Sequence, residues 1–461
     1  MKRSGPGIRG LLRRGLQCLA AALWIVSGLP DMVPASSLDA NPSLLAVADE
    51  RPLAGGIETQ WGGQIKAAGA LSWPDEDALL GNDDTGTSRD GSIDFRLKNQ
   101  TLLWQQVQVD MHYEVVLMGG DTLQALGDLE SSYPDLADAA WLSGGGVTDD
   151  RRLMDLTAVI ADDDRTVLYH RLDRLSVTLQ PSWGMLRIGR QALTWGNGFL
   201  FNPLDLFNPF APTDIARDYK IGDDMAAVQV ATPKGGDLQL VAVPRRDPAS
   251  GTVEAEQASG AAKLHFSSGT TEFDLLAARH YRDTVAGFGS RGYWGDAAWR
   301  LDAAWTFLDG EGEESGFLTL VANADYAWTW GGKNCYGFLE FYYNGLGKET
   351  YADALTDEDM AERLARGEIF TLGRVYLATE LQVELHPLWR VYLTAIHNLH
   401  DPSGVFQPRT VWDVTESLQM TVGADAAYGG RETEYGGFKI SATDRCQAPA
   451  DRVYLWLTFY F

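Results

Sequence analysis

DRVYLWLTFYF, residues 451–461, alternates strictly between two kinds of side chain. Successive residues of a β-strand point to opposite faces, so a period of two predicts a strand with two different environments. One face of this segment is purely apolar and suits lipid, while the other suits a polar space. The apolar face carries Val453, Leu455, Leu457, Phe459 and Phe461, and the other face carries Trp456, Thr458 and Tyr460.

The same alternation recurs upstream in segments of roughly 9 to 15 residues. Trp299 and Leu301, for example, share a face that excludes Arg300 and Asp302. The pattern predicts an all-β fold, a transmembrane antiparallel barrel of about 18 strands. The expected strands are 58–73, 91–99, 104–118, 166–181, 184–193, 223–233, 236–245, 259–267, 271–283, 284–294, 296–308, 315–329, 335–345, 369–385, 388–399, 404–415, 418–429 and 452–461.

The connections between these strands are expected to alternate between short turns and long loops. Short turns, such as 181–184 and 331–334, would lie at the periplasmic rim, and long loops would be extracellular or folded inward. The long loops are 74–90, 119–165, 194–222, 346–368 and 430–451. Within 346–368 a short helix is expected, with Thr356 as its cap, Asp359 at the capping-box position and Gly367 as its stop.

Composition supports a barrel over a helical membrane protein. Aromatic residues make up 11% of the chain and 49 residues are Gly, and after the first 30 residues no apolar run is long enough for a membrane helix. The formal net charge of −25 argues against nucleic acid as a partner. Cys335 and Cys446 are expected at opposite membrane faces and therefore unbonded.

The start of the chain has the features of an export signal. Basic residues precede an apolar stretch that runs from Leu16 to Leu29. We expect a signal peptide over 1–48, cleaved after Ala35 or Ala48, with the second site favoured. A periplasmic N-terminal segment, 49–57, would follow, and the barrel would occupy 58–461.

The most unusual stretch runs from Arg187 to Lys220. It contains Phe-Asn-Pro twice, at 201–203 and 207–209, so the chain must bury rings while it makes successive turns. We expect this loop to fold inward. Its charges either form a pore constriction or pair with one another in a plug or rim latch; the candidates are Arg190, Asp205, Asp214, Arg217, Asp218 and Lys220. Alternation places Arg190 on the lipid face unless a bulge at Gly189 turns it inward.

Polar side chains on the opposite face of the predicted strands are expected to line the lumen. The lumen-lining candidates are Arg300, Asp302, Arg374, Tyr376, Glu380, Glu384 and Arg390.

The chain resembles the proteobacterial porin-like barrels that include alginate-export-type proteins. Four features carry the resemblance: the signal sequence, the motif Gly189-Arg190-Gln191 followed by Trp195-Gly196-Asn197-Gly198, the alternating strands, and the terminal aromatic residue. The resemblance implies a passive conduit in the bacterial outer membrane. The end of the chain is similar to the signature that the outer-membrane assembly machinery reads, and it implies that role for Phe459 and Phe461.

The sequence therefore predicts a pore for passive or selective diffusion of small hydrophilic solutes. The alternatives are an outlet or docking component of a polymer or lipid exporter, and a non-conducting structural barrel. Outer-membrane lipid and lipopolysaccharide would be the other partners. The seven His residues form no spaced metal or nucleophile motif, so no catalytic residue, metal or cofactor is expected.

Overall fold

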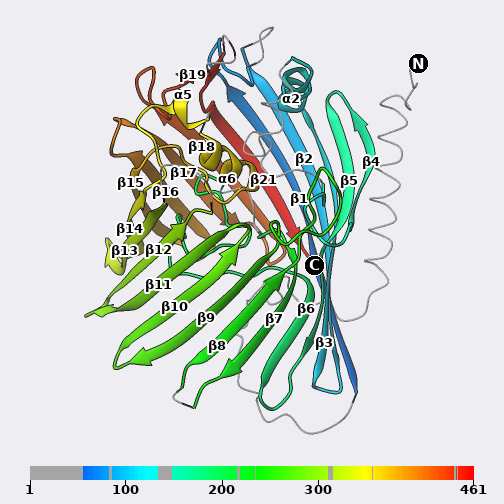
Figure 1. Cartoon of the computed structure of the whole chain (residues 1–461). Coiled ribbons are helices and arrows are strands. Elements are labelled where there is room, and N and C mark those ends of the chain that lie inside the picture. The colour runs from blue at the N-terminus through cyan, green and yellow to red at the C-terminus, as the bar shows by residue number, and fades with distance from the viewer. Residues whose placement is uncertain are drawn as a thin grey trace.

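The computed structural model describes residues 56–81, 86–132, 148–214, 219–233, 235–309, 315–355, 357–440, 443 and 445–461. It is a closed antiparallel β-barrel of 18 strands, as predicted (Figure 1). The predicted signal peptide and most of the segment 49–57 lie outside the described residues. The barrel strands are β1 (Ile57–Trp73), β2 (Ser88–Leu103), β3 (Val107–Gly120), β5 (Thr166–Leu179), β6 (Gly184–Gln191), β7 (Asp223–Ala231), β8 (Asp237–Val243), β9 (Ser259–Ser268), β10 (Thr271–His280), β11 (Asp283–Trp294), β12 (Ala297–Phe307), β13 (Gly316–Trp330), β14 (Lys333–Asn344), β15 (Val375–His386), β16 (Trp389–Asn398), β17 (Ser403–Asp413), β18 (Leu418–Tyr428) and β21 (Asp451–Tyr460).

The barrel closes where the last strand, β21, pairs with the first, β1. Their antiparallel ladder runs from Gln64 opposite Tyr460 to Trp73 opposite Asp451. An additional strand, β4 (Thr157–Asp163), pairs with the upper half of β5, beyond the point where β6 ends. The sequence did not predict β4 because it lies inside the stretch expected to be a long loop.

The alternation of the last strand is confirmed by the exposure of its side chains. Val453, Leu455, Leu457 and Phe459 are 41–47% exposed on the outside, whereas Tyr454, Trp456 and Thr458 are at most 9% exposed on the lumen side. Exposed aromatic residues also mark both ends of the barrel wall. They include Trp104, Trp183, Trp294 and Trp330 at the turn end, and Trp73, Phe307 and Tyr428 at the loop end.

An apolar band between two aromatic girdles is the surface that a bilayer requires of a closed barrel. The protein is therefore an integral protein of the bacterial outer membrane. None of the helices in the described part of the chain is long and apolar enough to cross a membrane.

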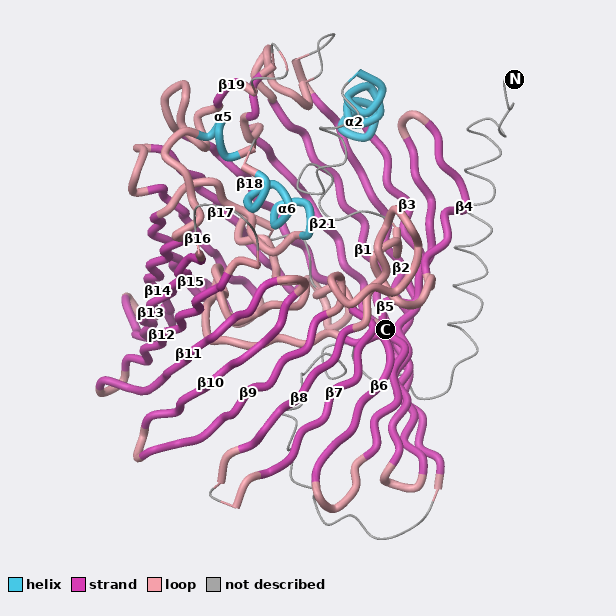
Figure 2. Tube along the Cα trace, in the orientation of Figure 1, coloured by secondary structure: helices cyan, strands magenta, loops and turns pink. Residues whose placement is uncertain are grey.

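Short turns and long loops gather at opposite ends of the barrel (Figure 2). Two connections at the loop end depart from the expected alternation, since 281–282 and 399–402 are also short. Cys335 lies near the turn that precedes β14, and Cys446 lies in the last long loop. Both cysteines are free, as predicted.

The long loops carry helices and a small two-stranded sheet. In α6 (Glu358–Arg366), the predicted stop at Gly367 is confirmed, with φ 68°. The cap is Asp357 and not the predicted Thr356, since the Asp357 carboxylate accepts a hydrogen bond from the Met360 N–H. Met360 thus holds the position predicted for Asp359, and Thr356 itself lies outside the described residues. The other loop elements are α2 (Asp121–Ser132), α5 (Tyr351–Ala354), β19 (Phe438–Lys439) and β20 (Cys446–Gln447).

Candidate functional site

The connection from β6 to β7 enters the lumen, and its described residues, 192–214 and 219–222, are hereafter the infolded segment. Two wall carboxylates hold the segment by its backbone. Glu340 on β14 accepts the N–H groups of Phe199, Leu200 and Phe201 at 2.6, 2.9 and 2.8 Å. Asp302 on β12 accepts the backbone and side-chain N–H groups of Asn197 at 2.5 and 2.8 Å. Charged acceptors make strong hydrogen bonds, so these contacts fix the path of the segment.

The rings of the Phe-Asn-Pro units are buried, as expected. Phe201 stacks on Tyr342 with ring centroids 4.3 Å apart, and Phe207 meets Trp195 edge-on at 5.7 Å. Phe207 and Leu204 join an apolar cluster with inward residues of β7–β12. The infolded segment therefore seals that side of the lumen.

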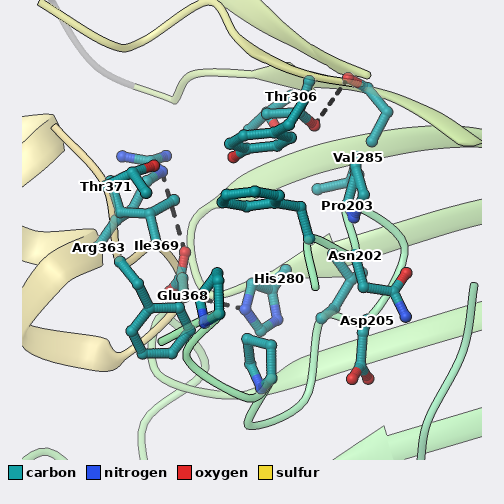
Figure 3. Close-up of a pocket in the computed structure, with 18 of the residues that line it drawn as sticks. Asn202, Pro203, Asp205, His280, Val285, Thr306, Arg363, Glu368, Ile369 and Thr371 are labelled. Carbon is teal, nitrogen blue, oxygen red and sulfur yellow. Dashed lines mark hydrogen bonds and ion pairs between the residues drawn. The ribbon is translucent and has the colours of Figure 1, made fainter. Parts of the chain in front are cut away.

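A second seal forms where the infolded segment meets the loop 345–374, which carries α5 and α6 (Figure 3). The cavity left between them is only about 90 Å³. Arg363 pairs with Asp283 of the wall, and His280 Nε2 lies 3.6 Å from Glu368 Oε1. Burial raises the pKa of Glu368. This junction fastens α6 to the wall and leaves only a small cavity between the two loops.

Two of the expected constriction charges, Lys220 and Asp205, are paired with each other. Lys220 Nζ lies 2.5 Å from Asp205 Oδ1, and both side chains are buried. Burial raises the pKa of Asp205 and lowers that of Lys220, while the contact between them opposes both shifts. This geometry matches the latch alternative at these two positions. Asp214 is half-buried at the turn after Ala211, and Arg217 and Asp218 lie outside the described residues.

Arg190 does not face the lumen, which corrects the inward orientation expected of a constriction residue. Both ladders of β6 keep their register through Gly189, so no bulge turns Arg190, and it stays on the outer row with Ile188. The segment 149–156 covers it there. Its guanidinium bonds Asp149 at 2.8 Å, Asp224 at 2.9 Å and the Met154 carbonyl at 2.6 Å. Arg190 is a buried clamp that holds this segment onto the wall.

The lumen-lining candidates divide between sealed and accessible positions. Asp302 and Tyr376 are buried beneath the infolded loops. Arg300, Glu380 and Arg390 lie in the turn-side half of the lumen with partly exposed side chains. Arg374 donates to the Gly347 carbonyl at the loop end, and Glu384 is half-buried near the turn end of β15.

Sequence reasoning named Glu380 and Arg390 singly but missed the row of polar side chains to which they belong. This row lies on β15–β18, β21 and β1 and is hereafter the polar lane. Three arginine–carboxylate pairs follow it from the loop end downward: Arg452–Asp425 at 2.5 Å, Arg409–Glu380 at 3.5 Å and Arg390–Asp413 at 3.0 Å. Their side chains are 11–35% exposed, against 5% or less for Asp205, Lys220 and Arg190. Gln407, Tyr454, Trp456 and Lys66 complete the lane.

A second charged cluster lies on β2, β3 and β5. Arg96 donates to Asp173 at 2.9 Å and to Glu114 at 3.0 Å, and its guanidinium lies 4.2 Å over the Tyr219 ring of the infolded segment. Lys98 donates to the Tyr219 hydroxyl at 3.0 Å. Alternation on β2, which places Asp94, Arg96 and Lys98 on one face, was the available signal. The cluster is buried and anchors the end of the infolded segment.

Phe459 and Phe461, the expected assembly signal, lie on the outside at the end of the barrel seam. Phe459 is on the outer row of β21, and the Phe461 ring stacks on Phe95 at 6.1 Å. Among the described residues, no group of His, Cys, Asp and Glu is arranged to hold a metal ion.

No family model matches the chain, and no curated protein matches it. Several solved barrels have a similar fold. One, described as Wzi of Escherichia coli, an outer-membrane protein involved in group 1 capsule assembly and a carbohydrate-binding β-barrel, is 9% identical with a TM-score of 0.48, covering 87% of this chain and 84% of that chain. A BenF-like porin from Pseudomonas fluorescens Pf-5 is 10% identical with a TM-score of 0.48, covering 88% and 98%. OccAB4 of Acinetobacter baumannii is 8% identical with a TM-score of 0.48, covering 89% and 100%.

Proposed function

We propose that this barrel is a selective diffusion pore for small hydrophilic solutes, and that solutes pass along the polar lane. The observation that carries the proposal is the contrast in accessibility between the two sides of the lumen. On one side, three ion pairs are partly exposed at successive depths: Arg452–Asp425, Arg409–Glu380 and Arg390–Asp413. On the other side, apolar clusters under the infolded segment seal the lumen. We therefore place the hydrated path along the lane.

The narrowest part of the proposed path lies at the middle of the lane. Tyr454 and Trp456 stack there with ring centroids 4.5 Å apart, and Lys66 Nζ lies 4.5 Å from the Trp456 ring. All three side chains are buried, unlike the arginine pairs above and below them. The proposed constriction is thus built by the wall, and the infolded segment narrows the lumen by filling its other side.

The pairing of the lane charges bears on ion selectivity. Every arginine in the three pairs lies beside a carboxylate, so a passing solute meets both signs at each depth. We expect weak discrimination between K⁺ and Cl⁻ and preferential passage of solutes with little net charge.

Planar-bilayer recordings of the purified, folded protein test the proposal. We expect ion current with weak selectivity, and Glu380→Gln should shift the reversal potential toward anions because it frees Arg409 from its carboxylate. Glu254→Gln, in the loop after β8, is the matched control and should leave selectivity unchanged. Absence of current from folded protein would reject the pore. It would favour the non-conducting barrel, with which the apolar clusters that fill part of the lumen are also compatible.

A further inference from the structure

A cavity of about 460 Å³ lies at the loop end of the polar lane, hereafter the vestibule. Wall residues of β17, β18 and β21 meet the infolded segment and the loops 345–374 and 429–450 there. Its lining combines polar and aromatic groups, among them Gln407, Asp425, Arg452, Thr213 and Tyr435. Its volume falls within the range of roughly 300 to 1,000 Å³ that is usual for small-molecule sites.

The charged groups in the described lining of the vestibule are already engaged. Arg452 donates through Nε to Asp425 Oδ2 at 2.6 Å, in addition to its Nη2 contact. Glu434 accepts hydrogen bonds from the Leu372 N–H, the Tyr376 hydroxyl and the Asn398 amide. A charged ligand would therefore have to break one of these arrangements, whereas a neutral ligand would not.

Gln407, a residue of the vestibule lining, carries one strong acceptor that has no donor. Its amide nitrogen donates to the Thr213 carbonyl at 3.1 Å and to Asp425 Oδ1 at 2.9 Å. Both partners are acceptors, which fixes the orientation of the amide and excludes the flipped form. The side chain is 1% exposed, and its Oε1 is buried with no partner. A buried acceptor without a donor costs free energy, which a ligand donor would recover.

The next lumen row adds a second unsatisfied polar group. Tyr454 lies opposite Gly423 in the ladder between β21 and β18, one lumen row below Asp425. Its hydroxyl is also buried without a partner. Tyr454 is not part of the vestibule lining, so a ligand would meet it only on moving down the lane. Its hydroxyl can both donate and accept, which suits a ligand that carries several O–H groups.

We infer that the vestibule binds a neutral, hydroxyl-rich solute such as a small sugar, which donates an O–H to Gln407 Oε1. The inference rests on the proposed pore function, because it names the class of solute that the pore would admit. Anions are disfavoured by the carboxylates and the open acceptor. Neither carboxylate is free to receive a cation, because Asp425 pairs with Arg452 and Glu434 accepts three hydrogen bonds.

Calorimetric titration of the full chain in detergent tests the inference, with glucose, glucuronate and glucosamine as probes that share a ring and differ in charge. Glucose should bind, and glucuronate and glucosamine should bind at least about tenfold more weakly, as expected when charge is desolvated without a partner. Equal binding of all three, or no binding of glucose, would overturn the inference.

Gln407→Met removes the acceptor and keeps the volume, and it should weaken glucose binding by about tenfold or more, the usual consequence of losing a buried hydrogen bond. Gln108→Met, at the turn end of β3, is the matched control and should bind as the unaltered protein does. Unchanged glucose binding by Gln407→Met would place the sugar elsewhere. If this variant fails to fold, the three-probe comparison on the unaltered protein still decides.

The two proposals fail separately. Glucose binding without ion current would remove the pore and leave the vestibule site standing. Ion current without glucose binding would keep the pore and reject the sugar. Dextran in place of glucose distinguishes free sugars from polymers, because binding of dextran alone would mean that the site recognises a polysaccharide and not a small solute.

Discussion

At the scale of single residues, Gly423 sets the width of the proposed path. It has no side chain on the lumen face of β18, and the Tyr454 ring lies across it: a Cβ at 423 would lie 2.2 Å from the Tyr454 hydroxyl oxygen and 2.4 Å from Cζ. Real Cβ atoms do not approach so closely, so any side chain at 423 must displace the ring into the lane.

Gly423→Val should therefore lower single-channel conductance while the barrel still forms. Recordings in planar bilayers measure the effect. Gly260→Val serves as the control, because the nearest atom to a Cβ at 260 is 3.9 Å away, and its conductance should match that of the unaltered protein. Equal conductance of Gly423→Val and the unaltered protein would place the path elsewhere.

Arg190 makes a separate prediction about stability. Arg190→Met leaves Asp149 and Asp224 buried without their shared cation, and breaking a buried pair in this way costs roughly 3–5 kcal/mol. Urea unfolding in detergent should show a loss of this size. Arg291→Met removes an exposed pair with Glu272 and should cost less than about 1 kcal/mol. A similar small loss for both variants would show that the clamp is not stabilising.

The same clamp predicts a pH dependence. Burial acts to raise the pKa of Asp149, but hydrogen bonds and charge from Arg190 and Arg152 outweigh it and lower the pKa to about 2. A carboxyl with a lowered pKa stabilises the fold above its ordinary value of 3.8 and loses that contribution as the pH falls toward 2.

Segment 149–156 should therefore exchange its amide hydrogens faster, after correction for intrinsic rates, between pH 4 and pH 2. Hydrogen-exchange mass spectrometry measures this directly. In Arg190→Met the segment should already be loosened at pH 4, so the change across this window should shrink. An unchanged profile in the unaltered protein would contradict the assignment of Asp149 as the acid-sensitive group.

At the scale of elements, the infolded segment depends on Glu340. One carboxylate accepts three consecutive N–H groups, and a hydrogen bond to a charged group contributes roughly 1.5–3 kcal/mol. Glu340→Gln keeps the volume but replaces one acceptor oxygen with a donor, so the segment should loosen. We expect larger and noisier single-channel currents, with the strand content by circular dichroism unchanged. Currents as steady as in the unaltered protein would show that aromatic packing alone holds the segment.

At the scale of the whole molecule, the fold could be predicted from the sequence because its signal is local. Alternation such as that of Val453 to Tyr460 can be read within one strand, and strands that follow one another along the chain mostly pair with one another. The strand β4 was not predicted, because it forms a strand only through its pairing with β5.

The site was less predictable, because its contacts join distant parts of the chain. Arg190 bonds Asp149 from another loop, and Gln407 bonds Thr213 of the infolded segment, which lies 194 residues away in the sequence. Composition correctly indicated that Phe201 and Phe207 would be buried, but it could not show which charges would pair beneath them. Alternation also placed Glu380 and Arg390 in the lumen without indicating that they pair with Arg409 and Asp413.

The position of the Phe461 ring gives a prediction about assembly. A Cβ at Gly63 would lie 2.5 Å from Phe461 Cζ and 2.3 Å from the Arg96 carbonyl oxygen. Gly63→Leu should therefore reduce the fraction of folded barrel, seen as the heat-modifiable band in gel electrophoresis. Gly69→Leu on the same strand has open space at its Cβ and should fold normally. Equal folding of the two variants would show that the ring position is unimportant.

The ladder between β1 and β21 also has a kinetic consequence. It joins residues at opposite ends of the sequence, whereas the other ladders join segments much closer along the chain. Entropy disfavours such long-range closure, though only by about 0.6 kcal/mol for each doubling of the loop, so ten paired positions outweigh it once they meet. Folding should thus proceed as a curling sheet that is zipped last along this line, and pulling on the two termini should unzip the barrel there first.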